Sequence, residues 1–313
     1  MMSPSPLTSG TVRIATRGSQ LALWQAHHVR ALLLLAHPAL AIELVVITTT
    51  GDRILDTPLA KIGGKGLFIK ELEQAILDDQ ADLAVHSMKD VPVALPATLH
   101  IPVVLAREDP RDCLIAACPL AALPLGAVVG TSSLRRRSQL LALRPDLELR
   151  DLRGNVTTRL DKLARGDFDG IVLASAGLRR LGLTAGVVAC FEPHEMLPAV
   201  GQGVIGIECR RGDRRIEALI AGLDDPLAHD AIRAERALNA ALDGGCQVPV
   251  AGHATVGEHM ISMVGLVASI DGKRMVRATQ TGPRRAAAAL GTAVGRELLA
   301  AGAADLLAEI GTL

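Results

Sequence analysis

Short apolar runs rich in β-branched residues alternate with helical patterns along most of the chain, from Val12 onward. The strands that this pattern predicts are 12–15, 42–48, 82–87, 101–106, 112–117, 127–130, 147–151, 170–174 and 203–209. The helices predicted between them are 19–35, 66–78, 133–143, 155–165 and 213–222. Regular alternation of this kind predicts α/β layers with largely parallel sheets.

The pattern changes near residue 226. One helix is predicted over 226–241, and an alanine-rich helix over 284–300. Between them lie three strand-like runs, and Asp271-Gly272 is a hairpin signal between the last two. Those runs are 248–256, 260–269 and 273–281. The pattern predicts a C-terminal α+β domain with a three-stranded antiparallel sheet.

The domain organisation follows from length and from proline-containing junctions. A chain of 313 residues is long enough for two or three domains, and the first 225 exceed one typical α/β unit. Junctions near 107–110 and 193–198 mark expected crossings between two lobes. We expect a first domain of 11–106 with 200–222, a second, arginine-rich domain of 107–199, and a third of 226–313.

Charge and composition exclude some classes of function. The chain has 33 basic and 33 acidic residues, whereas a general polyanion binder usually has a basic excess. One Trp, three Phe and no Tyr argue against base stacking. We therefore expect no nucleic-acid partner, and any anion site must be local.

The cysteines and the N-terminus bear on the compartment. The five cysteines, at 113, 118, 190, 209 and 246, lack the short paired spacing of a zinc site. A disulfide framework is not expected in a chain of this length. The first ten residues lack a signal-peptide pattern, and the run 31–36 is too short to span a bilayer. We expect a cytoplasmic protein with no membrane partner.

Two strand-to-helix turns are unusually polar. Residues 16–19 follow one predicted strand, and residues 130–136 follow another. Each turn combines hydroxyls, free backbone N–H groups and guanidinium groups, which suit carboxylates or phosphates. The alternative is ordinary N-capping of the two helices by Ser19 and Ser133, with solvated arginines.

Basic residues are concentrated between 135 and 180. This segment has eleven basic and six acidic residues, a local charge of +5 within a neutral chain. A solvated helix face would explain Arg137, Arg144 and Arg165, but it explains Arg135 and Arg153 less well. The segment is therefore a candidate site for an acidic ligand.

Residues 82–92 form an apolar strand that runs into a polar turn before Pro92. Lys89 and Asp90 would lie at the carboxyl end of that strand, where ligands bind in open α/β sheets. An ionised Asp90 could hold amine or pyrrole N–H groups and stabilise developing positive charge. The alternative is an Asx turn leading into the proline.

Two glycine-rich segments are candidate loops at the site. Residues 61–66 contain Lys61 and Lys65 but fail as a Walker motif, because Gly66 follows the second lysine. They predict a flexible basic flap or an ordinary loop with solvated lysines. Cys246 follows a glycine pair, where a bulky group could approach the sulfur. It is a candidate attachment point or a small buried hydrophobe.

These motifs together resemble the porphobilinogen deaminase family. The resemblance spans about 13 to 250, and the region after 255 matches only in character. The matching stretches are RIATRGSQLALWQA, TTGDRILDTPLAKIGGKGLFIKELE, ADLAVHSMKDVP, EDPRDCLI, GTSSLRRRSQL, LRGNVTTRLDKL, ASAGLRRLGL, LPAVGQGVIGIECR and GGCQVPV.

The resemblance implies two lobes like type II periplasmic binding proteins, an active cleft between them, and a third domain that carries the cysteine loop. It implies a dipyrromethane cofactor joined by a thioether to Cys246. Four molecules of the substrate porphobilinogen are then added one at a time, each losing ammonia, and hydrolysis releases hydroxymethylbilane. We expect a monomer.

The resemblance also implies residue roles. Asp90 contacts pyrrole nitrogens, stabilises the cation formed when ammonia leaves, and takes part in proton transfers. The segment 54–65 corresponds to a mobile loop over the cleft. Carboxylates of the substrate or chain are bound by Arg17, Ser19, Arg153, Arg159 and Arg180, and those of the cofactor by Lys89, Ser133, Arg135 and Arg136.

A function of another class is a non-catalytic two-lobed binding protein for small anions. The predicted lobes alone would permit it. Cys246 and Asp90 argue for the enzyme instead, because a receptor for small anions needs neither a covalent attachment point nor a carboxylate among its cations.

Overall fold

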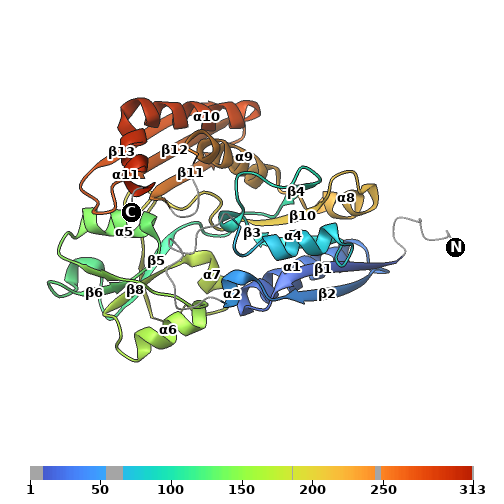
Figure 1. Ribbon diagram of the computed structural model, residues 1–313, viewed down its shortest axis with the longest axis horizontal. Coiled ribbons are helices and arrows are strands. Elements are labelled where there is room, and N and C mark those ends of the chain that lie inside the picture. The colour runs from blue at the N-terminus through green and yellow to red at the C-terminus, as the bar shows by residue number, and fades with distance from the viewer. Residues whose placement is uncertain (1–9, 54–65, 185, 244–247, 312–313) are drawn as a thin grey trace. The chain divides into compact units, whose positions relative to one another are not determined.

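The computed structural model describes residues 10–53, 66–184, 186–243 and 248–311 (Figure 1). The chain divides into two compact units. The described parts of the first unit are 10–53, 66–107 and 204–229. The second unit has 108–203 and the chain from residue 230 onward. The first unit is therefore discontinuous in sequence.

A five-stranded mixed sheet forms the first unit, with the order β2-β1-β3-β10-β4. Its strands are β1 (Thr11–Arg17), β2 (Ala41–Ile47), β3 (Leu83–Ser87), β4 (Leu99–Val104) and β10 (Ile205–Arg210). β1 is parallel to β2 and β3, whereas β10 is antiparallel to both β3 and β4.

Helices cover both faces of this sheet. Successive residues of β1 pack on opposite sides: Ile14 lies in a core with Val29 and Leu33 of α1, and Ala15 lies in a core with Leu72 of α4. The central strand β3 is buried on both faces, and it begins with the apolar run Leu83-Ala84-Val85. The helical segments are α1 (Gln20–Ala36), α2 (Thr50–Arg53), α4 (Lys70–Leu77), η2 (Met88–Asp90), α8 (Arg214–Ile220) and η4 (Ala221–Leu223).

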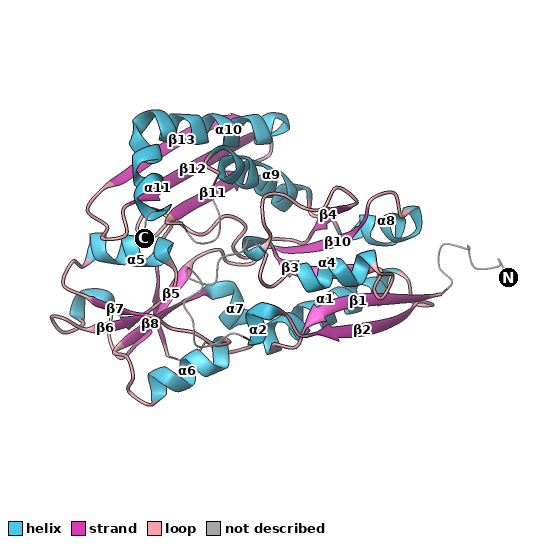
Figure 2. Cartoon of the chain, in the orientation of Figure 1, coloured by secondary structure: helices cyan, strands magenta, loops and turns pink. Residues whose placement is uncertain are grey.

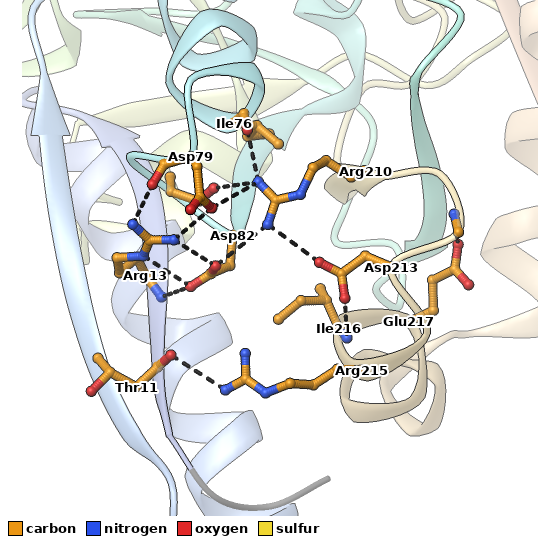
Figure 3. Close-up of polar contacts among 12 residues, drawn as sticks. Thr11, Arg13, Ile76, Asp79, Asp82, Arg210, Asp213, Arg215, Ile216 and Glu217 are labelled. Carbon is orange, nitrogen blue, oxygen red and sulfur yellow. Dashed lines mark hydrogen bonds and ion pairs between the residues drawn. The ribbon is translucent and has the colours of Figure 1, made fainter.

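An ion-pair network joins three elements of this unit (Figure 3). Arg13 on β1 and Arg210 on β10 lie on either side of Asp79 and Asp82, which precede β3. The Arg13 Nη2 atom is 2.9 Å from Asp82 Oδ1, and the Arg13 amide donates to Asp82 Oδ2 at 2.7 Å. Burial raises the pKa of Asp82, but the bonds from Arg13 outweigh it and lower the pKa. The network fixes the start of β3 between its two neighbours.

The second unit contains a mixed sheet of the same relative order, β7-β6-β8-β5-β9. Strand β6 is parallel to β7 and β8, and β5 is antiparallel to β8 and β9. The strands are β5 (Asp112–Ala116), β6 (Val128–Gly130), β7 (Glu148–Arg150), β8 (Gly170–Ala174) and β9 (Val187–Cys190). The helical segments are η3 (Leu120–Ala122), α5 (Leu134–Leu143), α6 (Val156–Ala164) and α7 (Ser175–Arg180).

The rest of the second unit is a three-stranded antiparallel sheet, β11-β12-β13, covered by helices (Figure 2). Leu238 of α9 and Val294 of α10 pack with Met263 of β12 in its core. The strands are β11 (Val250–Val256), β12 (Met260–Ala268) and β13 (Met275–Pro283). The helical segments are α9 (Pro226–Ala241), η5 (Arg284–Ala286), α10 (Ala287–Leu298), η6 (Leu299–Ala303) and α11 (Ala304–Gly311).

The predicted α/β fold with a C-terminal antiparallel sheet is confirmed, with three corrections. The two larger sheets are mixed rather than largely parallel, because β10 and β5 run against their neighbours. Strand β9 and helix α7 were not predicted. A disulfide joins Cys113 to Cys190, although a disulfide framework was not expected. The two cysteines are 77 residues apart, and the β5–β9 register places them opposite each other.

None of the described helices combines the length and the apolar character that crossing a membrane requires.

The crossing of α9 and α10 predicts a site where any side chain is destabilising. A Cβ atom at Gly291 would lie 1.9 Å from the Ala234 carbonyl oxygen. Backbone cannot yield as a flexible side chain does, so Gly291→Ala should lower the free energy of unfolding by ~1–3 kcal/mol. Chemical denaturation monitored by circular dichroism measures this change.

The matched control is Gly222→Ala in η4, where an added Cβ meets no atom within 4 Å. It should leave the denaturation midpoint nearly unchanged. Equal denaturation midpoints for the two variants would show that α9 and α10 can move apart at little cost. That result would contradict the prediction.

Candidate active site

A pocket opens in the first unit at the carboxyl ends of β1 and β3, and it encloses about 450 Å³, part of it open to solvent. Three predicted site residues meet there: Arg17, Ser19 and Asp90. The polar residues that line the pocket are Arg17, Ser19, Gln25, His86, Ser87 and Asp90. The charged, hydroxyl and amide groups of this lining suit a polar ligand.

The β1–α1 turn supplies one side of the pocket. Ser19 has extended backbone angles, and its Oγ accepts a hydrogen bond from the Ala22 amide at 3.3 Å, so Ser19 is the N-cap of α1. The capping alternative is confirmed for this residue. Because Ser19 also lines the pocket, the N-terminus of α1 lies at its edge.

Arg17 ends β1 with its guanidinium held in place. Its Nε donates to Asp52 Oδ2 at 3.1 Å, and its Cζ lies 4.2 Å from the centroid of the Phe68 ring. Burial raises the pKa of Asp52, but hydrogen bonds from Arg17 and Thr49 outweigh it and lower the pKa. An ionised Asp52 and a cation–π contact therefore orient Arg17. Neither partner was predicted as a site residue.

The end of β3 places Asp90. Met88, Lys89 and Asp90 form a 3₁₀ turn, closed by a bond from the Val91 amide to the Met88 carbonyl. This backbone bond forms the turn, so the predicted Asx-turn alternative is not needed. Among the described residues, none forms a hydrogen bond or an ion pair with the Asp90 carboxylate. Asp90 is therefore a half-buried, available acceptor in the pocket wall.

The turn is fixed from behind by β10. The Met88 amide donates to the Val204 carbonyl at 2.9 Å. A Cβ atom at Gly206 would lie only 2.2 Å from the Met88 sulfur, so the side chain of Met88 occupies the space that Gly206 leaves. A side chain at position 206 would therefore displace the Met88 thioether from behind the turn.

Gln25 and Ser87 join α1 to the end of β3. The Gln25 Nε2 atom donates to Ser87 Oγ at 2.8 Å, and the Gln25 side chain is almost fully buried. Sequence analysis did not single out either residue. The only signal was helical periodicity, because Gln25 occupies a position that otherwise faces the core.

In the second unit, Arg135 and Arg136 surround one buried carboxylate. Asp112 Oδ2 lies 2.8 Å from Arg135 Nη2, and Asp112 Oδ1 lies 2.7 Å from Arg136 Nη2. Burial raises the pKa of Asp112, but the two arginine charges outweigh it and hold the pKa well below its usual range. Gln202 adds a third donor at 3.0 Å. Both arginines are thus buried, with an internal counter-ion that was not predicted.

Ser133 caps α5, as the capping alternative proposed. Its Oγ accepts from the Arg136 amide at 3.4 Å. The structure therefore assigns Ser133, like Ser19, a local role in addition to any ligand contact. Lys89 is half-buried in η2 of the first unit.

The β7–α6 loop and α7 position the remaining arginines. Arg159 Nε donates to the Gly154 carbonyl at 2.8 Å, and the Arg153 carbonyl accepts from Lys162 at 3.3 Å. Arg180 Nη2 donates to the Gly203 carbonyl at 2.7 Å. Burial lowers the pKa of Arg180 to about 10, so the guanidinium is still charged at neutral pH but has lost part of its hydration.

Three predicted site residues lie outside the described residues: Cys246, Lys61 and Lys65. The 54–65 segment lies outside them as well.

Comparisons with known proteins agree with this picture. The family model "Porphobilinogen deaminase, dipyromethane cofactor binding domain" matches residues 12–218. The model "Porphobilinogen deaminase, C-terminal domain" matches residues 230–300. Of solved structures, a periplasmic substrate-binding protein of an ABC transporter from Coxiella burnetii is similar with a TM-score of 0.41. Its identity is 15%, over 70% of this chain and 94% of that one, too low to inform function.

Curated relatives match almost end to end. The porphobilinogen deaminase of Syntrophotalea carbinolica is 53% identical over 306 residues, which are 97% of both chains. That of Syntrophobacter fumaroxidans is 51% identical, over 97% of this chain and 99% of its own. The described residues place a carboxylate and a fixed guanidinium in one pocket, and the sequence matches extend over both units; the chain belongs to the porphobilinogen deaminase family.

Proposed function

We propose that the porphobilinogen deaminase reaction of this chain takes place at the first unit's pocket, with Asp90 as its central carboxylate. The enzyme joins four porphobilinogen molecules one at a time with loss of ammonia, and hydrolysis releases hydroxymethylbilane. The observation that carries the proposal is the Asp90 carboxylate, which lines the pocket without a partner among the described residues.

The pocket suits a substituted pyrrole. Porphobilinogen carries two carboxylate arms, an aminomethyl group and a ring N–H. Arg17 can bind a carboxylate in a bidentate manner, because Phe68 and Asp52 already fix its plane. Asp90 accepts the ring N–H and stabilises the positive charge that develops as the C–N bond breaks and ammonia leaves with its electron pair.

The residues of the second unit fit a cofactor with acidic arms. Two guanidiniums share the single charge of Asp112, so the cluster keeps a net positive charge. We propose that Arg135 and Arg136, with Ser133 and Lys89, hold the carboxylates of the dipyrromethane, and that Cys246 forms its thioether. When bound, the dipyrromethane supplies the pyrrole carbon that receives the first substrate.

Arg153, Arg159 and Arg180 are proposed to bind carboxylates of the substrate or of the growing chain. Arg180 has the strongest support, because burial has already removed part of its hydration. A carboxylate that approaches it displaces little water and interacts in a medium of low polarity. By the same resemblance, Lys61 and Lys65 belong to a loop over the cleft.

We further propose that the enzyme is a cytoplasmic monomer that binds no nucleic acid. The neutral net charge supports the last point. In a reducing cytoplasm, Cys113 and Cys190 would be thiols rather than the disulfide described above. Gel filtration and thiol labelling in intact cells test the monomer and the compartment.

The attachment site predicts a mass difference. Purified protein should have the mass of its chain plus two pyrrole units, and Cys246→Ser should remove this excess. Cys118→Ser, at a half-buried free cysteine of the second unit, is the control and should retain it. Intact mass spectrometry makes the measurement; active protein without the excess mass would refute the proposal.

Asp90→Asn should lower kcat by ~10²–10³-fold, because the amide keeps the shape but loses the charge that stabilises the cation. The rate of ammonia release from porphobilinogen is the measurement. Asp78→Asn, at the exposed end of α4, is the control and should retain wild-type turnover. Near-normal turnover of the Asp90 variant, at an unchanged melting temperature, would contradict its central role.

Arg179 and Arg180 offer a matched pair. Arg180→Gln should raise KM for porphobilinogen by at least ~10-fold, because it removes a partly desolvated partner of a carboxylate. Arg179→Gln should change KM by no more than ~2-fold, because that side chain is half-exposed and pairs with Glu108 and Asp109. Equal effects in steady-state kinetics would count against a specific role of Arg180.

A further inference from the structure

A buried acid–base pair lies behind one wall of the pocket. His86 Nε2 on β3 is 2.8 Å from Glu208 Oε2 on β10, and the two side chains are 3% and 0% exposed. The strand register pairs His86 with Gly206, so Glu208 is the diagonal neighbour on the same face. His86 also lines the pocket together with Asp90. The mechanism proposed above uses neither member of the pair.

The hydrogen bond determines which ring nitrogen is basic. An ionised carboxylate only accepts hydrogen bonds, so the shared hydrogen belongs to His86 Nε2. The lone pair of the neutral ring is then on Nδ1. No described residue forms a hydrogen bond with this nitrogen. Glu208 therefore holds His86 in the tautomer that can accept a proton, and it stabilises the imidazolium that results.

The groups around the pair set its charge. Glu73 of α4 interacts electrostatically with both members, exposed Lys70 acts on Glu73, and Arg17 and Asp90 line the same pocket. Burial raises the pKa of Glu73, and the Glu208 charge raises it further. Both effects favour the uncharged form of Glu73 beside the pair.

Two carboxylate oxygens of this cluster are buried away from any polar partner among the described residues. Within the described chain, Glu73 Oε1 and Glu208 Oε1 are buried without a hydrogen-bond partner. A buried polar atom without a partner is costly, and such atoms in native proteins call for an explanation. A group that changes protonation during turnover provides one.

The reaction releases a proton that needs an acceptor. When ammonia leaves, the methylene carbon of one pyrrole becomes electrophilic. The free α-carbon of the receiving pyrrole attacks it, and a C–C bond forms. The C–H bond at that α-carbon then breaks, its electrons return to the ring, and the proton must leave. A base within reach of the pocket is required once per addition.

We propose that His86 accepts this proton at Nδ1 and that Glu208 is its positioning residue. The role rests on the proposed function. The imidazolium returns its proton to the departing ammonia or to solvent before the next addition, so the cycle balances.

Nuclear magnetic resonance of the wild-type enzyme tests the tautomer without measuring activity. Histidine labelled with ¹⁵N gives a pair of ring-nitrogen signals for each of the nine histidines, and His86→Gln identifies the pair that disappears. The expected result is an unprotonated Nδ1 and a protonated Nε2 at pH 8. A hydrogen on Nδ1 would overturn the proposal.

Kinetics with porphobilinogen deuterated at its free α-carbon test the role. His86→Gln should lower kcat by ~10²-fold, and its deuterium isotope effect on kcat should rise, because C–H cleavage becomes rate-limiting. His100→Gln is the matched control: His100 lies 3.0 Å from Glu217 but does not line the pocket, and the variant should behave as wild type. A slower His86→Gln variant with an unchanged isotope effect would mean a structural role and overturn the proposal.

If His86→Gln does not fold, Glu208→Gln carries the test. It keeps a hydrogen-bond acceptor but removes the counter-charge, so the acid limb of the pH–rate profile should move to lower pH; an unmoved limb would overturn the proposal. Wild-type protein that releases no ammonia from porphobilinogen would overturn the proposed function and this role with it. Active wild-type protein with an insensitive His86→Gln variant would overturn only the role of His86.

Discussion

The backbone bond between Met88 and Val204 is the constraint on which the pocket depends. Asp90 has no hydrogen bond of its own to a described residue, so its position comes from the turn that carries it. That turn is fixed by the Met88 amide, bonded to Val204, and by the Met88 side chain over Gly206. A carboxylate without a partner can thus be held still and remain available to a ligand, since the fixing bonds all belong to its neighbours.

The second unit holds charged groups of the opposite sign, because two of its arginines are buried. Arg135 and Arg136 are nearly as buried as a core leucine, and one Asp112 carboxylate balances them only in part. Removal of that carboxylate would leave two uncompensated charges, whereas the pair as built retains an attraction for anions. A neutral chain can therefore hold a local positive charge where buried arginines outnumber their carboxylate partners, as well as where basic residues cluster in the sequence.

Sequence periodicity predicted most helices and strands, but it did not predict strand directions or the contacts between distant residues. Helix α1 and strand β3 could be predicted because their apolar residues repeat at the helical and strand periods. Ser19 and Ser133 could be recognised as caps because each is a serine directly before a predicted helix. The direction of β10 could not be predicted, because the apolar pattern of a strand does not show whether it runs parallel or antiparallel to its neighbours.

The partners of the site residues were harder to predict than the residues themselves. Asp52 beside Arg17, Asp112 beside Arg136, and Glu208 beside His86 each join separate segments of the chain. His86 and Glu208 are 122 residues apart and meet through the register of β3 and β10. The same is true of Cys113 and Cys190. The family resemblance named Arg17 and Arg136 as candidate site residues, but the counter-charges beside them became visible only in the folded chain.

The place of β10 between β3 and β4 has a consequence for the newly made chain. Strand β4 ends at Val104, yet its hydrogen-bonding neighbour begins only at Ile205. At roughly 5–20 residues per second, a ribosome leaves this edge exposed for several seconds. All five strands of the other large sheet end by Cys190, so the lobe encoded second can be completed before the lobe encoded first. Unprotected β-edges invite association, so the nascent polypeptide is most exposed to aggregation during this interval.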